Sequence, residues 1–205
     1  MDGLLLDTER PMIALWVKVG QNMGYNVTPE LIIRTLGIDG PGTRAIIMGE
    51  LGKDFPYDKV REEVHNLAGI EEKNGIALRP GVIAMLDHLS LKKIPAIVAT
   101  STRRETAFRK LAQAGIRDRF TLLVGGDEIT NGKPAPDIFL KAAERLGKDP
   151  SQCVGFEDSP AGLQALHAAG IRSVFVKDMA IPTGEVLATV WRQYSSLAEA
   201  VELFE

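Results

Sequence analysis

The second half of the sequence alternates between short apolar runs and segments with helical patterns. From Leu78 onward the apolar runs are IPAIVAT, FTLLVGG, CVGFED and RSVFVKD, at residues 94–100, 120–126, 153–158 and 172–178. A helical pattern at 80–89 precedes the first run, and others separate or follow the runs, at 102–114, 136–146, 160–169 and in a last segment that ends near Leu203. Short apolar strands that alternate with helices are typical of a parallel sheet with helices on both faces. The sequence therefore predicts an α/β fold around a parallel sheet.

Residues 10–75 contain helical patterns and no convincing strand. Pro11 suits a first helical turn, apolar side chains follow it at helical spacing, and Gly24 ends the segment. Thr28-Pro29 is typical of the start of a second helix. Two further helices are expected, at 43–51 and 57–74. We therefore predict two domains, a helical one over 10–75 and an α/β one made of 1–9 and 76–205.

Charge and hydropathy exclude several classes of partner. The 205 residues carry a formal net charge of −3, which gives no electrostatic basis for binding nucleic acid. No apolar stretch reaches the length of a membrane span, and Met1 is followed by an acidic residue rather than a basic leader region. The single Cys153 excludes internal disulfides, and its apolar surroundings favour a packing role. We expect a cytoplasmic protein with no nucleic-acid or membrane partner.

Polar residues end the apolar runs of the predicted sheet. They are Thr100, Ser101, Asp127, Glu157 and Asp158. Ligands of open parallel sheets bind beyond the carboxyl ends of the strands, and these residues are expected to share that edge.

Two of these strand ends have residues that suit a metal and an anion. Glu157 and Asp158, in GFEDSPAG, offer the carboxylate oxygens that Mg²⁺ prefers, although an acidic pair also suits a helix N-terminus without any metal. Thr100, Ser101 and Thr102, in IVATSTRR, offer hydroxyl and backbone N–H groups for an anion, although Ser and Thr are also ordinary N-caps.

Lys133 precedes a proline-initiated helix in TNGKPAPDIF. An ammonium group there could neutralise a phosphoryl group and a neighbouring carboxylate, whereas most single loop lysines are only solvated. The hydroxyl, lysine and paired-acid segments follow one another at successive strand-to-helix junctions, which favours a shared site.

The segments MDGLLLDTE, VATST, NGKPAPDIF and GFEDSPAG, in this order, give the chain a close resemblance to the haloacid dehalogenase (HAD) superfamily. The resemblance is to the group that contains β-phosphoglucomutase and sugar-phosphate phosphatases. It implies a Rossmann-like core, a small helical cap inserted after the first strand, and Mg²⁺-dependent phosphoryl transfer through an aspartyl-phosphate.

The resemblance also implies a role for each matching residue. Thr100 and the backbone of Ser101, with Thr102 beside them, would bind phosphoryl oxygens. Lys133 would bridge the phosphate and the attacking carboxylate. Asp158 would bind Mg²⁺ with Glu157 as direct or water-mediated support. Asp2 would be the general acid/base, and its backbone carbonyl would also contact the metal.

The sequence departs from the family at its first residue. In the motif D-x-D-G the attacking aspartate comes first, and here Met1 occupies position x. The nucleophile would therefore fall one residue before Met1, and the apolar strand that carries it is absent. We expect a sheet without its first central strand and a chain that is inactive as given, with a mis-assigned start favoured over a strandless pseudoenzyme.

Features of the helical domain favour a phosphatase over a mutase. The mutases of this group have a histidine where this chain has Met12, and an S-R pair that is absent after Gly37. Gly37, Asp39 and Arg44 are the candidate substrate contacts, and the expected substrate is a small phosphorylated metabolite of the sugar-phosphate type. The alternatives are a phosphosugar mutase and a catalytically dead HAD-fold binding protein; a metal-free dehalogenase fits the acidic pair less well.

Overall fold

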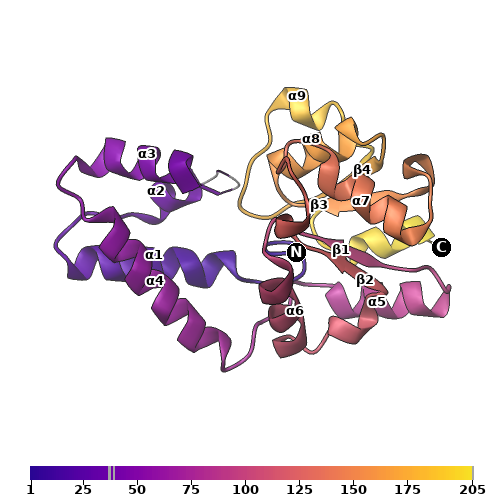
Figure 1. Ribbon diagram of the computed structural model, residues 1–205, viewed down its shortest axis with the longest axis horizontal. Helices are drawn as coiled ribbons and strands as arrows, with labels where there is room; N and C mark the ends of the chain where they lie inside the picture. Colours follow the sequence, from indigo (N-terminus) through magenta and orange to yellow (C-terminus); the bar gives the residue numbers. More distant parts are fainter. Residues whose placement is uncertain (37, 39, 205) are drawn as a thin grey trace.

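The computed structural model describes residues 1–204 apart from 37 and 39. The helices and strands alternate in the second half of the chain, as Figure 1 shows. The α-helices are α1 Glu9–Asn22, α2 Pro29–Ile33, α3 Gly40–Leu51, α4 Tyr57–Glu72, α5 Val82–Leu91, α6 Arg104–Gln113, α7 Asp137–Leu146, α8 Pro160–Ala168 and α9 Gly184–Leu187. The strands are β1 Ile97–Ala99, β2 Leu122–Val124, β3 Val154–Glu157, β4 Arg172–Val176 and β5 Arg192–Tyr194.

Helices α1 to α4 lie to one side of the strands, at the left of Figure 1, and they enclose a hydrophobic cluster of their own. The cluster contains Ile13, Trp16, Val27, Ile47, Val60 and Val64 among its buried members. The hydroxyl oxygen of Thr28 accepts a hydrogen bond of 3.3 Å from the backbone N–H of Leu31, so Thr28 is the N-cap that its sequence context predicts. The separate cluster supports a helical cap, while the domain boundaries at 9/10 and 75/76 stay a prediction.

All strands pair in parallel, in two groups. β1 pairs with β2, and β3, β4 and β5 pair in that order. α7 packs on β1 and β2, and α8 packs on β3 and β4. The predicted α/β fold with parallel strands is confirmed.

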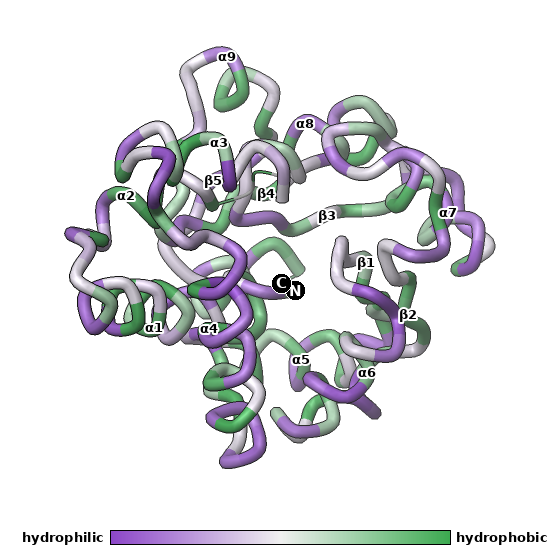
Figure 2. Tube along the Cα trace, turned by 60° about the vertical axis from the view of Figure 1, so that its left-hand side comes forward, coloured by the Kyte–Doolittle hydropathy of each residue, from purple (hydrophilic) through white to green (hydrophobic). Residues whose placement is uncertain are grey.

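The two groups of strands are separated at the centre of the core. Among the residues described here no strand lies between β1 and β3, as the resemblance led us to expect (Figure 2). A cavity of about 440 Å³ occupies this space, lined by all residues of β1 and β3 together with Met1 and mostly apolar side chains of the flanking helices.

The end of the chain differs from the prediction. The helix expected to end near Leu203 is a short 3₁₀ helix, Glu199–Phe204. The strand β5 was not predicted, because Arg192 and Gln193 are exposed and the segment has none of the apolar character that marked the other strands. Only its position at the edge of the sheet, beside β4, makes it a strand.

A tight turn at the start of the chain directs the first acidic residues toward the strand ends. The backbone N–H groups of Leu5 and Leu6 donate to the carbonyl oxygen of Met1, at 2.8 and 3.1 Å. Gly3 allows this turn because its φ is +74°, a conformation that costs other residues free energy. In the described part of the chain, no helix is both long and apolar enough to cross a membrane.

Candidate active site

Asp2 lies at the centre of a hydrogen-bonded cluster that joins three parts of the chain. Its Oδ1 accepts a hydrogen bond of 2.9 Å from Thr8 Oγ1, and its Oδ2 accepts one of 2.9 Å from Thr102 Oγ1. Lys110 Nζ of α6 donates to Oδ1 at 3.2 Å. The same ammonium group lies 3.0 Å from a carboxylate oxygen of Glu72, at the end of α4.

These partners decide the charge of Asp2. Burial by itself would raise the pKa of the Asp2 carboxyl, because it disfavours the charged form. The ammonium groups of Lys110 and of the N-terminus, with the hydroxyls of Thr102 and Thr8, outweigh burial and lower this pKa below its ordinary value. Asp2 is therefore held as a carboxylate, the form that accepts a proton.

The hydroxyl-rich loop after β1 lies against Asp2. Thr100 is buried, and its Oγ1 accepts a hydrogen bond of 3.2 Å from the backbone N–H of Thr102. Ser101 is exposed and packs against Gly126, where a Cβ atom would lie only 2.2 Å from the Ser101 carbonyl oxygen. The two strand ends can approach this closely only because residue 126 is glycine.

Lys133 and Glu157 form a buried ion pair. The Lys133 ammonium donates to Glu157 Oε1 and also lies 4.8 Å from the centre of the Phe139 ring. Ser159 Oγ donates to the other carboxylate oxygen at 3.0 Å. Burial opposes the charge of Glu157, but the Lys133 ammonium, the N-terminal ammonium and the Ser159 hydroxyl together hold its pKa below the ordinary value. Glu157 is thus neutralised by lysine rather than open to a ligand.

The pKa of Asp158, the neighbour of Glu157, is shifted in the opposite direction. It is buried, and no ion pair to it is formed by any described residue. Burial raises its pKa to about 7, and the adjacent charges of Glu157 and Glu9 act in the same direction. A buried carboxyl of this kind is stabilised either by a proton or by a cation.

Asp158 belongs to a group of three carboxylates. One oxygen each from Glu9, Asp158 and Asp178 lies within 4.8 Å of the others. Glu9 Oε2 and Asp178 Oδ2 are buried without a hydrogen-bond partner in the described chain. Burial, together with the charges of Asp178 and Asp2, raises the pKa of Glu9 to about 7. Unpartnered carboxylate oxygens around Asp158 fit a hard divalent cation such as Mg²⁺, whereas Asp2 and Glu157 lie outside this group.

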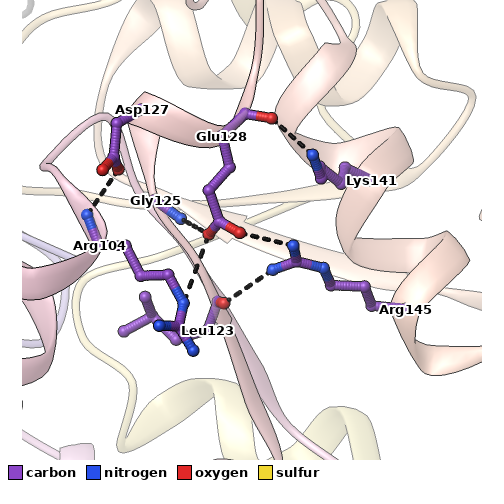
Figure 3. Close-up of polar contacts among 7 residues, drawn as sticks. All are labelled: Arg104, Leu123, Gly125, Asp127, Glu128, Lys141 and Arg145. Carbon is purple, nitrogen blue, oxygen red and sulfur yellow. Dashed lines mark hydrogen bonds and ion pairs between the residues drawn. The ribbon is translucent and has the colours of Figure 1, made fainter.

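Asp127 was expected at the same edge of the sheet, beyond the carboxyl ends of the strands, but its carboxylate interacts with the backbone of a neighbouring helix. Its Oδ1 accepts a hydrogen bond of 2.7 Å from the backbone N–H of Arg104, the first residue of α6 (Figure 3). The adjacent Glu128 forms an ion pair of 2.5 Å with Arg145 and accepts a hydrogen bond from the backbone N–H of Gly125. These two acids hold the loop after β2 in place.

The substrate contacts predicted in the helical region are Arg44, Gly37 and Asp39. Arg44 of α3 forms an ion pair of 2.5 Å with Asp58 and lies 5.0 Å from the centre of the Tyr57 ring, so both contacts are with α4. Gly37 and Asp39 lie outside the described residues.

Four residues of the site were not singled out from the sequence. Thr8 and Glu9 lie in the quoted motif MDGLLLDTE, and Asp178 ends the run RSVFVKD, so the strand-end rule that pointed to Asp158 would also have found Asp178. Nothing in the sequence marked Lys110 as a site residue, because one lysine on an amphipathic helix is ordinarily exposed.

Sequence comparison places the chain in a family. Residues 1–176 match the model of the haloacid dehalogenase-like hydrolases. The chain is 32% identical to the phosphorylated carbohydrates phosphatase of Thermotoga maritima over 180 residues, which cover 85% of this chain and 81% of the relative. It is 31% identical to the fructose-1-phosphate phosphatase YqaB of Escherichia coli over 189 residues, which cover 86% of this chain and 93% of the relative.

Comparison with solved structures agrees. A protein from Thermotoga maritima, described as a candidate β-phosphoglucomutase, has 29% identity and a TM-score of 0.80, with 99% of this chain and 94% of that chain covered. CbbY from Rhodobacter sphaeroides, solved in complex with phosphate, has 25% identity and a TM-score of 0.74, with 97% and 92% covered. The chain therefore belongs to the haloacid dehalogenase-like hydrolases and is an enzyme of that family.

Proposed function

We propose that this protein is a Mg²⁺-dependent phosphatase of small phosphorylated metabolites of the sugar-phosphate type, which acts through an aspartyl-phosphate. The observation that carries the proposal is the hydrogen bond of 2.9 Å between Thr102 and Asp2, residues that are 100 positions apart. It joins the loop assigned to phosphate binding to the carboxylate assigned to proton transfer.

The residues around the phosphate would act mainly by position and charge. The hydroxyl of Thr100 and the backbone N–H groups after β1 would bind phosphoryl oxygens. The Lys133 ammonium would offset the negative charge of the phosphoryl group while it stays paired with Glu157. Asp158, supported by the neighbouring acids and the Asp2 carbonyl, would hold Mg²⁺, and the bound metal would reduce the repulsion between phosphate and attacking carboxylate.

Asp2 would move the protons. With its lowered pKa it is ionised before substrate binds, and an anionic phosphoryl group nearby would raise that pKa. Asp2 could then donate a proton to the leaving oxygen and later take one from the attacking water.

The attacking carboxylate of the family motif corresponds to the position directly before Met1, so we assign no residue of the sequence to that role. The residues of this chain are proposed to bind the metal and the phosphate. The cavity of about 440 Å³ between β1 and β3 is the place where the strand that carries this carboxylate would lie.

The names of the relatives support the substrate class. Two of the relatives act, by their names, on phosphorylated carbohydrates and on fructose 1-phosphate. Discrimination among such substrates is expected to depend on the cap, because the cap closes over the site and excludes water.

Hydrolysis of p-nitrophenyl phosphate with Mg²⁺ tests the proposal. The 205-residue chain is compared with a form that carries a short apolar strand ending in aspartate directly before Met1. We expect turnover only in the extended form, and its loss on Asp158→Ala. Unchanged turnover in that variant refutes the site, and interconversion of two phosphosugar isomers in a coupled assay would identify a mutase instead.

A further inference from the structure

The three-carboxylate group contains two residues for which the family resemblance implied no role. Glu9 begins α1, the first helix of the cap, and Asp178 follows β4 in the core. Asp158 follows β3 and is the residue already assigned to the metal. The group therefore joins the start of the cap to the ends of two neighbouring strands.

Asp178 is held in place by two arginines that use only one of its oxygens. Arg10 and Arg79 lie 2.5 and 2.7 Å from Oδ1. The side chain is 1% exposed, and Oδ2 has no hydrogen-bond partner in the described chain. A buried carboxylate oxygen with no donor loses the hydration that it would have in water, so its free energy is raised unless a cation or a water reaches it.

Glu9 has still fewer partners. Among the described residues, its carboxylate forms no hydrogen bond and no ion pair, and Oε2 is buried. The neighbouring Arg10 is directed to Asp7 and Asp178 instead. Glu9 and Asp158 therefore face each other with no protein cation paired to either.

The spacing of the three oxygens suits one small cation. Mg²⁺ binds oxygens at about 2.1 Å, so ligands on opposite sides are about 4.2 Å apart. The oxygens of Glu9, Asp158 and Asp178 lie within 4.8 Å of one another, close enough for one cation to reach all three directly or through its bound water.

We propose that Glu9 and Asp178 complete the divalent-cation site of Asp158, so that the bound cation ties the first turn of the cap helix α1 to the core. This inference rests on the proposed metal site of the phosphatase. It adds that the cation is held by a carboxylate at the start of α1 as well as by the residues that follow β3 and β4.

Mn²⁺ binding to the metal-free 205-residue chain, followed by electron paramagnetic resonance at pH 8, tests the inference without any turnover. The variants are Glu9→Gln and Asp178→Asn, which keep the shape of each side chain. Asp118→Asn is the matched control, because that side chain is fully exposed and outside the group. We expect roughly tenfold or greater loss of affinity in both test variants, the size typical of groups that orient metal ligands, and none in the control.

The increase in melting temperature on addition of Mg²⁺ is the second measurement, because a cation that binds only the folded state stabilises it. Asp178→Asn can weaken the arginine contacts and so fail to fold. In that case Glu9→Gln alone tests the inference, because its side chain has no partner to lose. Wild-type affinity in Glu9→Gln overturns the inference.

Asp158→Asn separates this inference from the proposed function. If it abolishes Mn²⁺ binding while Glu9→Gln binds normally, the metal site stands and only the added ligands are wrong. If Asp158→Asn also binds Mn²⁺ like the wild type, or if the wild-type chain binds none, both the proposed metal site and the inference are wrong.

Discussion

Lys110 Nζ lies 3.2 Å from Asp2 Oδ1 and 3.0 Å from Glu72 Oε1, so one ammonium group on α6 joins Asp2, the residue proposed for proton transfer, to the last turn of α4. The side chain of Lys110 is only 14% exposed, which limits screening by solvent. Burial lowers the pKa of Lys110, but the carboxylates of Asp2 and Glu72 outweigh it and raise that pKa.

Replacement of Lys110 with methionine is expected to raise the pKa of the Asp2 carboxyl, because burial would then act with less opposition. NMR titration of the carboxyl carbon measures this change. The variant should also lose about 1–3 kcal/mol of unfolding free energy, since two partly buried carboxylates lose a partner. Lys110→Arg keeps the charge and is the control. An unchanged Asp2 titration in Lys110→Met would show that the ammonium group does not set its charge.

Replacement of Lys133 with methionine is expected to destabilise the core by about 3–5 kcal/mol, because Glu157 would be left buried and unpaired. Urea denaturation measures the loss. The double variant Lys133→Met, Glu157→Gln removes the charge as well and should recover part of the stability. Additive losses in the double variant would contradict the pairing.

Replacement of Gly3 with alanine tests the close approach of the first turn to Asp158. Gly3 has φ +74°, and a Cβ atom there would lie 2.2 Å from Asp158 Oδ2. Gly24 has φ +85° with nothing within 4 Å of such an atom, so Gly24→Ala measures the backbone cost alone, about 1–2 kcal/mol. Gly3→Ala should cost a further 1–3 kcal/mol or so and weaken Mn²⁺ binding. Equal stability of the two variants would argue against the contact.

The pH dependence of stability should reveal the buried Asp158. Its folded-state pKa of about 7 lies above the ordinary value of 3.8, so the folded protein holds a proton that the unfolded chain releases. This contribution to stability is complete below pH 3.8 and is lost as the pH rises through about 7. Metal-free wild-type protein should therefore become less stable than Asp158→Asn as the pH increases, in thermal denaturation with a chelator present. Added Mg²⁺ should reverse the order above pH 7, since the metal binds the ionised carboxylate. A constant difference between the two proteins from pH 4 to pH 8 would show that Asp158 is not perturbed.

Local patterns predicted most of the fold. The apolar runs around β1, β2, β3 and β4 and the helices that follow them were readable because a strand buried on both faces needs consecutive apolar residues. The short strand β5 was not, because an exposed edge strand has no such requirement. Its formation depends on the open edge of β4, which is a property of the assembled sheet.

The sequence by itself determined which residues lie between the strands and the helices that follow them, and therefore which side chains could share a site, Thr100, Lys133 and Asp158 among them. The tertiary structure decided which of them have partners: Glu157 is neutralised by Lys133, Asp127 caps α6, and Asp158 faces Glu9 and Asp178 instead. It also brought Lys110 to Asp2 across 108 positions of sequence. The physical reason is that the local pattern of residues locates the end of a strand, whereas the burial and charge pairing of a side chain depend on neighbours that only folding brings together.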